Sequence, residues 1–99
     1  MVVKRDGRRE PFDRLKIVAG VRKAVEKRPV SSEKIEALVD DIETALMERA
    51  AKEINSTEVG EMVIKRLQDL DDVAYVRFAS VYLDFEDLRD FEKVIEKLI

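Results

Sequence analysis

The chain has 99 residues, of which 45% are hydrophobic, so it is long enough to enclose one hydrophobic core and too short for two. It contains no cysteine and no histidine, which excludes disulfides, Cys/His zinc sites, thiol catalysis and imidazole acid–base chemistry. No run of 18 apolar residues and no apolar amino-terminal leader occurs, so neither a membrane span nor a signal peptide is expected. These features predict a single soluble, cytoplasmic domain, residues 1–99.

Charge is distributed unevenly along the chain. Residues 1–28 contain ten Lys or Arg against four Asp or Glu, which gives +6, and residues 29–99 contain nine against eighteen, which gives −9. Because local potential rather than net charge steers ligands, the amino-terminal part is expected to attract anions. A merely solvated surface is the alternative explanation of the same charges.

Residues 1–12 are predicted to form a small β cap. Residues 2–5, VVKR, are predicted as the first strand, and the dipeptide Asp6-Gly7 that follows readily supplies the two positive φ angles of a hairpin turn. Pro11 is expected to end the second strand. The short segment 53–55 is predicted as a third strand beside this hairpin.

The remainder, residues 13–99, is predicted to form about five helices. Asp13 caps the first, which Pro29 stops. Either Ser31 or Ser32 caps the second, which continues to about residue 52. The apolar positions at helical spacing in the first three helices are Leu15, Val18, Val21 and Val25, then Ile35, Leu38, Val39, Ile42 and Leu46, then Val59, Met62, Val63, Leu67 and Leu70.

Two further helices complete the predicted fold. The fourth starts at Asp71 or Asp72 and is apolar around most of its circumference, so it is expected to be the most buried. The last is amphipathic, with an apolar face made of Leu88, Phe91, Ile95 and Leu98. The predicted architecture is α+β and mainly helical, with a β-hairpin or three-stranded cap on a bundle of about five helices.

Cations dominate the candidate binding residues. Lys4 and Arg5 lie on the first predicted strand, where alternation sends them to opposite faces. Lys16 lies in the first turn of the first helix, where the helix dipole disfavours a cation and favours an anion. A phosphate bound there would meet the helix end and the lysine together. An ordinary solvated lysine is the alternative.

Three other residues have two interpretations each. Glu10 either pairs with Arg8 or Arg9 or accepts hydrogen bonds from a ligand. Ser56 is most economically the cap of the third helix, and it meets a ligand if that helix end faces a cleft. Tyr82 is either half-buried core or a surface on which a base stacks. No Gly-rich phosphate loop occurs, which sets P-loop hydrolysis aside.

The segment VVKRDGRREPFD at residues 2–13, together with Lys16 and Ile17, resembles the opening of the ATP-cone family. That family comprises the regulatory cones of ribonucleotide reductases and of NrdR-type transcriptional repressors. The likeness continues through 28–31, 54–61 and 72–82 to Asp84-Phe85, and it covers practically the whole chain. The block 74–82 and the closing helix look specifically like the NrdR version.

The resemblance implies an adenine-nucleotide pocket between the β cap and the helices and no catalysis. ATP or dATP is the implied effector, with Mg²⁺ as an ion that can accompany it. The implied binding residues are Lys4, Arg5 and Lys16 at the phosphates and Glu10 near the nucleoside, with a second group of Val3, Phe12, Ile17, Ser56 and Tyr82.

The family pattern is departed from at two points. Gly60 stands where some reductase cones have a histidine near the sugar and phosphates. The Cys₄ zinc ribbon of NrdR repressors is absent, so sequence-specific DNA binding is not expected. The predicted function is an allosteric switch of homo-oligomerisation. Two alternatives are a nucleic-acid-binding module that uses the basic hairpin and a helical interaction module without a ligand.

Overall fold

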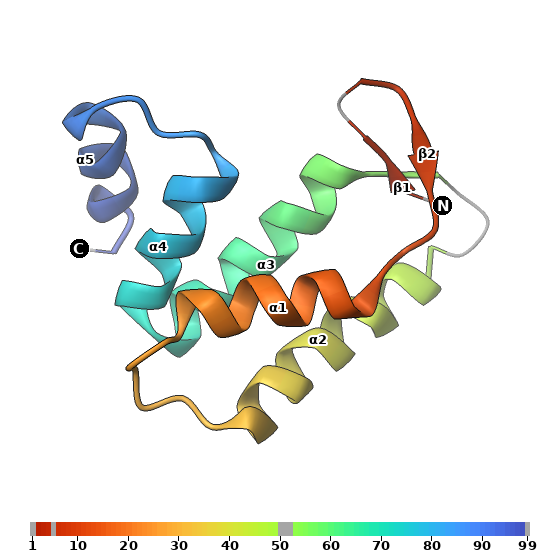
Figure 1. Ribbon diagram of the computed structural model, residues 1–99, viewed down its shortest axis with the longest axis horizontal. Helices are drawn as coiled ribbons and strands as arrows, with labels where there is room; N and C mark the ends of the chain where they lie inside the picture. Colours follow the sequence, from red (N-terminus) through yellow and green to blue (C-terminus); the bar gives the residue numbers. More distant parts are fainter. Residues whose placement is uncertain (1, 5, 50–52, 99) are drawn as a thin grey trace.

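The computed structural model describes residues 2–4, 6–49 and 53–98. Its described elements follow the predicted order of a hairpin, two helices, a short strand and three helices (Figure 1). They are β1 (Val2–Val3), β2 (Arg9–Glu10), α1 (Arg14–Ala24), α2 (Ser32–Met47), β3 (Ile54–Asn55), α3 (Ser56–Leu70), α4 (Asp72–Tyr82) and α5 (Leu88–Glu96). The predicted α+β, mainly helical fold with a small β cap is confirmed.

The β cap is a three-stranded sheet in the order β2-β1-β3. Strand β1 runs antiparallel to β2, with Val2 opposite Glu10, and parallel to β3, with Val2 opposite Ile54. The predicted third strand is therefore confirmed. It ties the hairpin to the start of α3, so the cap includes residues well outside the first twelve.

The hairpin turn differs in detail from the prediction. Gly7 has a φ of 86°, but Asp6 is not among the residues with positive φ. The Asp6 carboxylate instead accepts a hydrogen bond from the backbone N–H of Arg8 at 3.0 Å. An aspartate side chain that bonds the backbone two residues on fixes a turn without a strained φ of its own.

Side-chain caps begin three of the helices as predicted. In each, an oxygen accepts a hydrogen bond from a backbone N–H that has no partner within the helix. The pairs are Asp13 with Leu15, Ser31 with Lys34 and Asp71 with Ala74. The predicted cap at Ser56 is wrong, because Asn55 is the cap residue of α3, without a side-chain bond, and Ser56 is already helical.

The first helix ends earlier than predicted. It closes at Ala24, whereas Pro29 lies five residues further on. Lys27 adopts a left-handed φ of 63°, which is incompatible with a continuing helix. The chain therefore turns before the proline has any effect. The end of α2 is at Met47, and the predicted continuation to residue 52 falls partly outside the described residues.

The hydrophobic core lies where the first four helices meet. All five positions of the stripe predicted on α2 are buried, with Val39 and Ile42 wholly inaccessible. From α3, Val63 and Leu67 point into the same core. Gly20 of α1 also lies in a helix contact, since a Cβ there would be 3.4 Å from the ring of Phe78 on α4. A methyl group would fit at this distance, so the contact does not by itself require a glycine at position 20.

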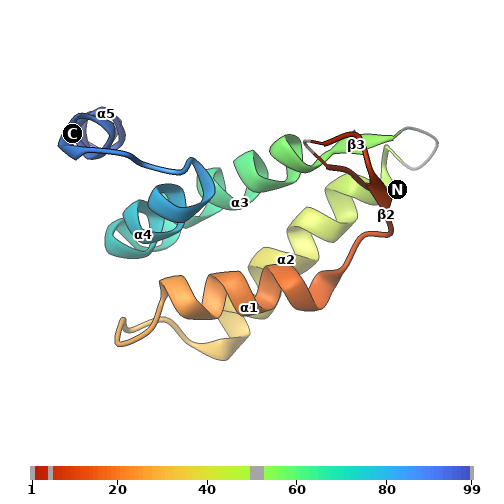
Figure 2. The same cartoon turned by 45° about the horizontal axis from the view of Figure 1, so that its top comes forward.

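Three expectations about burial are wrong. Leu15 begins the predicted α1 stripe but is 77% exposed. Helix α4, expected to be the most buried, is less buried than α2, and its Val81 is 83% exposed. On α5 the buried residue is Val94, while Leu88 and Ile95 are exposed. Helix α5 lies at the end of the molecule away from the β cap, against α4, which leaves part of its apolar face without a neighbour (Figures 1 and 2). Nothing described covers its outer edge.

In the part of the chain that the structure describes, no helix is both long and apolar enough to cross a membrane.

Candidate functional site

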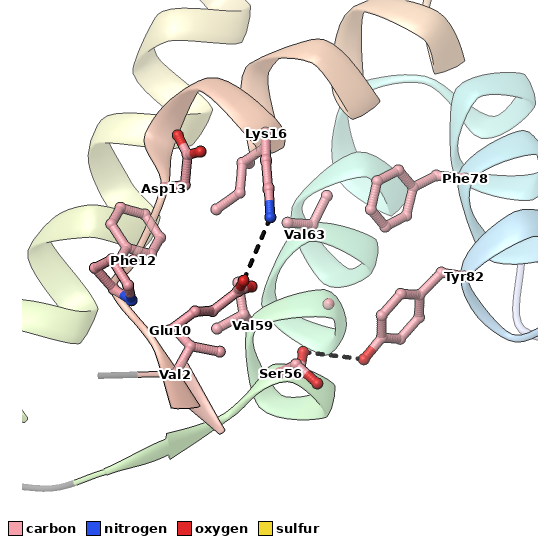
Figure 3. Close-up of a pocket in the computed structure, with 13 residues that line it drawn as sticks. Val2, Glu10, Phe12, Asp13, Lys16, Ser56, Val59, Val63, Phe78 and Tyr82 are labelled. Atoms are coloured by element: carbon pink, nitrogen blue, oxygen red, sulfur yellow. Dashed lines mark hydrogen bonds and ion pairs between the residues drawn. The ribbon is translucent and has the colours of Figure 1, made fainter. Parts of the chain in front are cut away.

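A cavity of about 370 Å³ lies between the β cap, the first turns of α1, and the helices α3 and α4 (Figure 3). This volume falls in the range of small-molecule sites. Its wall consists of Val2, Glu10, Pro11, Phe12, Asp13, Lys16, Ile17, Ser56, Val59, Gly60, Val63, Phe78 and Tyr82. Four segments far apart in the sequence therefore meet at one hollow.

Local structure places the wall residues. Glu10 ends strand β2, and Lys16 is the third residue of α1, so the short linker that carries Phe12 brings both to one rim. Helical spacing does the same on the other side. Ser56 begins α3, and Val59, Gly60 and Val63 follow on one face of that helix.

A single carboxylate joins two lysines at the rim. Glu10 Oε2 lies 3.3 Å from Lys4 Nζ and 3.4 Å from Lys16 Nζ. Partial burial raises the pKa of Glu10, but the hydrogen bond from Lys4 and the charge of Lys16 outweigh it and hold the pKa below its usual value. The carboxylate is therefore ionised at neutral pH, and two cations face it from two different elements.

The predicted pairing of Glu10 with a hairpin arginine is wrong. Arg8 pairs with Asp6, and Arg9 pairs with Glu53, which precedes strand β3. Both arginines thus bond outside the cavity wall, because alternation along β2 turns Arg9 to the face opposite Glu10. Glu10 is left to the lysines.

The rest of the wall is largely apolar and aromatic. The rings of Phe78 and Tyr82, one turn apart on α4, stack with centroids 6.0 Å apart and planes at 18°. The Tyr82 hydroxyl donates a hydrogen bond to the Ser56 carbonyl at 3.1 Å. The same ring lies directly against Gly60, where an added Cβ would overlap it. Figure 3 shows this side of the cavity opposite Phe12.

The structure brings most of the predicted binding residues to the cavity. Lys4 reaches its rim through Glu10. Arg5 lies outside the described residues. Val3 is not among the lining residues, and its neighbour Val2 takes that place because adjacent strand residues face opposite sides. The predicted residues that line the cavity directly are Glu10, Phe12, Lys16, Ile17, Ser56 and Tyr82.

Several lining residues were not singled out by the sequence. Val59 and Val63 were assigned to a core-facing stripe, and Phe78 to a helix apolar on most sides. One sequence signal could have pointed toward this wall. Gly60 interrupts a good helix at a cost of about 1 kcal/mol relative to alanine, which indicates a close approach by another group. That group is the Tyr82 ring.

The described residues contain no group of three or more Asp or Glu arranged to hold a metal ion. The anionic side chains at the cavity are Glu10, which faces the lysines, and Asp13, which caps α1. At this rim Glu10 therefore faces two lysine ammonium groups.

The fold and the cavity define a class of protein: a small α+β domain able to hold a ligand that has an apolar body and an anionic end. Comparison with known families agrees, since the model of the ATP cone domain matches residues 1–88. The chain belongs to the ATP-cone family, whose members are nucleotide-binding regulatory domains.

The chain is also similar throughout to proteins named transcriptional repressor NrdR. It is 56% identical over 99 residues to those of Pelobacter propionicus and of Geobacter sulfurreducens, spanning all of this chain and 66% of each relative. It is 52% identical over 98 residues to that of Dictyoglomus turgidum, spanning 99% of this chain and 65% of the relative. The chain therefore spans just under two thirds of the length of these relatives, and its cone is of the NrdR type.

Proposed function

We propose that this domain binds ATP or dATP in the cavity beside the β cap and converts binding into a change of self-association, without catalysis. One observation carries the proposal. Lys4 and Lys16 converge from the hairpin and from α1 on one anion position, at the rim of a largely apolar cavity. This arrangement suits a nucleotide, because positive charge is available for its phosphates and an apolar wall for its base.

The phosphates would lie at the lysine rim. The first turn of α1 holds no acidic residue, and Lys16 stands there against the unfavourable helix dipole. A phosphate beside this helix end would be stabilised by the dipole and by Lys16 together. Lys4 adds a second cation from the sheet, so an incoming oligophosphate is met from two directions. Arg5 remains a predicted contact.

The base would lie against the aromatic and aliphatic wall. Phe12 and Ile17 border the cavity on the α1 side, and Phe78 and Tyr82 border it on α4. Planar rings and branched side chains favour contact with a purine over contact with water, because the contact removes apolar surface of both partners from water. Ser56 contributes its position at the start of α3, where its carbonyl already holds the Tyr82 hydroxyl.

The same wall offers a route from ligand to surface. Phe78 and Tyr82 also line a second cavity, of about 250 Å³, between α1 and α4, where Val81 joins the wall. A nucleotide that favours one position of the Tyr82 ring therefore favours one arrangement of the outer side of α4. Val81 and Leu88 expose apolar surface there and on α5, which suits contact with a second copy.

The basic hairpin gives less support to nucleic-acid binding. Arg8 and Arg9 are each engaged by an acidic residue of this chain, and no aromatic residue of the described hairpin offers a stacking surface. We propose no sequence-specific DNA contact for these residues. A magnesium ion, where present, would arrive with the nucleotide. The cytoplasm is the proposed location because free adenine nucleotides are met there.

A ligand panel tests the proposal. Melting temperature is measured with ATP, dATP, GTP and duplex DNA at two salt concentrations, and self-association is followed by sedimentation velocity. Stabilisation by the adenine nucleotides should grow by mass action, reaching about 2.7 kcal/mol when the free ligand is a hundredfold above its Kd. A shift that only DNA produces, and that salt abolishes, would instead support the nucleic-acid alternative.

A further inference from the structure

Glu10 lies where an anionic ligand of the lysine pair would have to lie. One of its oxygens, Oε2, is within 3.4 Å of both ammonium groups, those of Lys4 and Lys16. The two ammonium groups are therefore separated by no more than the sum of the two distances. A phosphate oxygen that bonds both lysines in this arrangement therefore competes with the carboxylate for the same two donors. Figure 3 shows the Glu10 carboxylate directed into the cavity at Lys16.

The carboxylate is held there by weak, reversible interactions. The side chain of Glu10 is 32% exposed, and those of Lys4 and Lys16 are 36% and 63% exposed. Water competes for exposed ion pairs, so each one contributes little. A phosphate group offers more charge and several acceptor oxygens, so it outcompetes a carboxylate for the same donors. Replacement of the Glu10 carboxylate by a phosphate is therefore feasible, and breaking the two ion pairs costs free energy.

We propose that Glu10 is an internal competitor for the phosphate position, so that a ligand binds the Lys4–Lys16 pair by displacing the carboxylate of the protein itself. This inference rests on the proposed function and adds to it a minimum affinity that a ligand must reach in order to bind. Displacement lowers the affinity of every anion by the same factor. Weak ligands such as orthophosphate then fall below useful occupancy, whereas an oligophosphate with many contacts still binds.

The alternative role of Glu10 is purely structural. On that view the carboxylate only ties the hairpin to α1, and its loss weakens the fold and the site together. The two roles predict opposite changes in anion affinity when its charge is removed. A competitor that is lost leaves two uncompensated lysines and tighter anion binding, whereas a lost structural tie leaves a looser site and weaker binding.

The experiment is calorimetric titration with inorganic tripolyphosphate and with pyrophosphate. These probes have no base, so any contact between Glu10 and a nucleoside does not enter the result. The wild-type chain is compared with Glu10→Gln and Glu10→Ala. Glu53→Gln is the matched control, because Glu53 pairs with Arg9 on the same cap but lies outside the cavity wall, and its loss changes the net charge equally.

The expected result is tighter binding of both probes by the two Glu10 variants, on the order of three- to tenfold, with Glu53→Gln close to wild type. Equal or weaker affinity of the Glu10 variants, including undetectable binding by all the proteins, would overturn the inference. Thermal denaturation of each variant without ligand shows that the comparison is made between folded proteins.

Titration of the wild type with ATP separates this inference from the function on which it rests. If ATP does not bind, the proposed function fails whatever the variants do. If ATP binds and Glu10→Gln gains no affinity for tripolyphosphate, only the competitor role fails.

Discussion

The ring of Tyr82 lies directly on Gly60, in the space where any other residue would carry its Cβ. The contact joins α4 to the start of α3, and the Tyr82 hydroxyl extends it by donating to the Ser56 carbonyl at 3.1 Å. All three residues line the cavity beside the β cap. The absence of one side-chain carbon at Gly60 thus decides where an aromatic wall of the site stands.

Replacement of Gly60 by alanine tests this contact. The added methyl group would push the Tyr82 ring from its place, and overpacking of this kind costs about 1–3 kcal/mol. Alanine returns about 1 kcal/mol as a better helix former. We expect a net loss of up to about 2 kcal/mol in the free energy of unfolding, measured by urea denaturation.

Gly20→Ala is the matched control for that variant. A Cβ at Gly20 would lie 3.4 Å from the Phe78 ring, at the edge of ordinary contact. The helix-propensity gain should therefore dominate, and Gly20→Ala should be at least as stable as wild type. If Gly60→Ala proved as stable as Gly20→Ala, the Tyr82 contact would not be the reason for glycine at position 60.

Lys16→Ala should weaken ATP binding by roughly tenfold or more, because it removes a charge-assisted phosphate contact worth roughly 1.5–3 kcal/mol. Calorimetry measures the change directly. Lys65→Ala serves as control, since Lys65 is an exposed lysine of α3 that does not line the cavity. Unchanged ATP affinity of Lys16→Ala would show that the phosphates do not bind at the rim formed by Lys4 and Lys16.

Sequence patterns predicted the elements whose burial is decided locally. The apolar stripe of α2 repeats at helical spacing and is buried along its whole length, because α1 and α3 cover the same face. The α5 stripe repeats equally well, yet Leu88 and Ile95 are exposed while Val94 is buried. Periodicity indicates that a helix has an apolar face, but the arc that is covered depends on neighbours.

The residues of the candidate site also fall into two groups, those that local sequence indicates and those that only tertiary packing brings to the cavity. Lys16 and Glu10 were identifiable because they lie close together in the chain, at the junction of a strand and a helix. Phe78 becomes part of the site only through the packing of α4 against α3, which no local pattern encodes. Gly60 indicates locally that some group approaches its helix, but not which group. Val3 was assigned through the family resemblance, whereas the cavity is lined by Val2, because the inward face of a two-residue strand is fixed by its partner strands and not by its sequence.

The pairing of Arg28 with Asp71 predicts an acid-sensitive contribution to stability. Asp71 caps α4 and accepts from the Arg28 guanidinium at 3.0 Å, with only 7% of its side chain exposed. Burial raises the pKa of Asp71, but the backbone N–H of Ala74 and the charge of Arg28 outweigh it and hold the pKa below its usual value of 3.8.

A carboxyl group with a lowered pKa contributes its stability above its unfolded pKa and loses it as the pH falls through the folded value. Asp71→Asn keeps a capping oxygen but removes the charge. We expect it to cost about 1 kcal/mol at pH 7 and progressively less below pH 3.8. Urea denaturation across that range measures the difference. A gap from wild type that stays constant with pH would contradict the role of the charge.

The exposed apolar residues on α4 and α5 predict where copies of the chain meet. Val81 and Leu88 are 83% and 78% exposed, so a change to serine removes little buried surface and should alter stability by no more than about 0.5 kcal/mol. The double variant Val81→Ser/Leu88→Ser should nevertheless reduce nucleotide-dependent self-association in sedimentation velocity, because apolar area drives association.

Met47→Ser is the control, since Met47 is 71% exposed at the end of α2 and does not line either cavity beside Tyr82. If the double variant associated like wild type while Met47→Ser did not, the interface would lie at the β-cap end, and the route through Tyr82 would not lead to it.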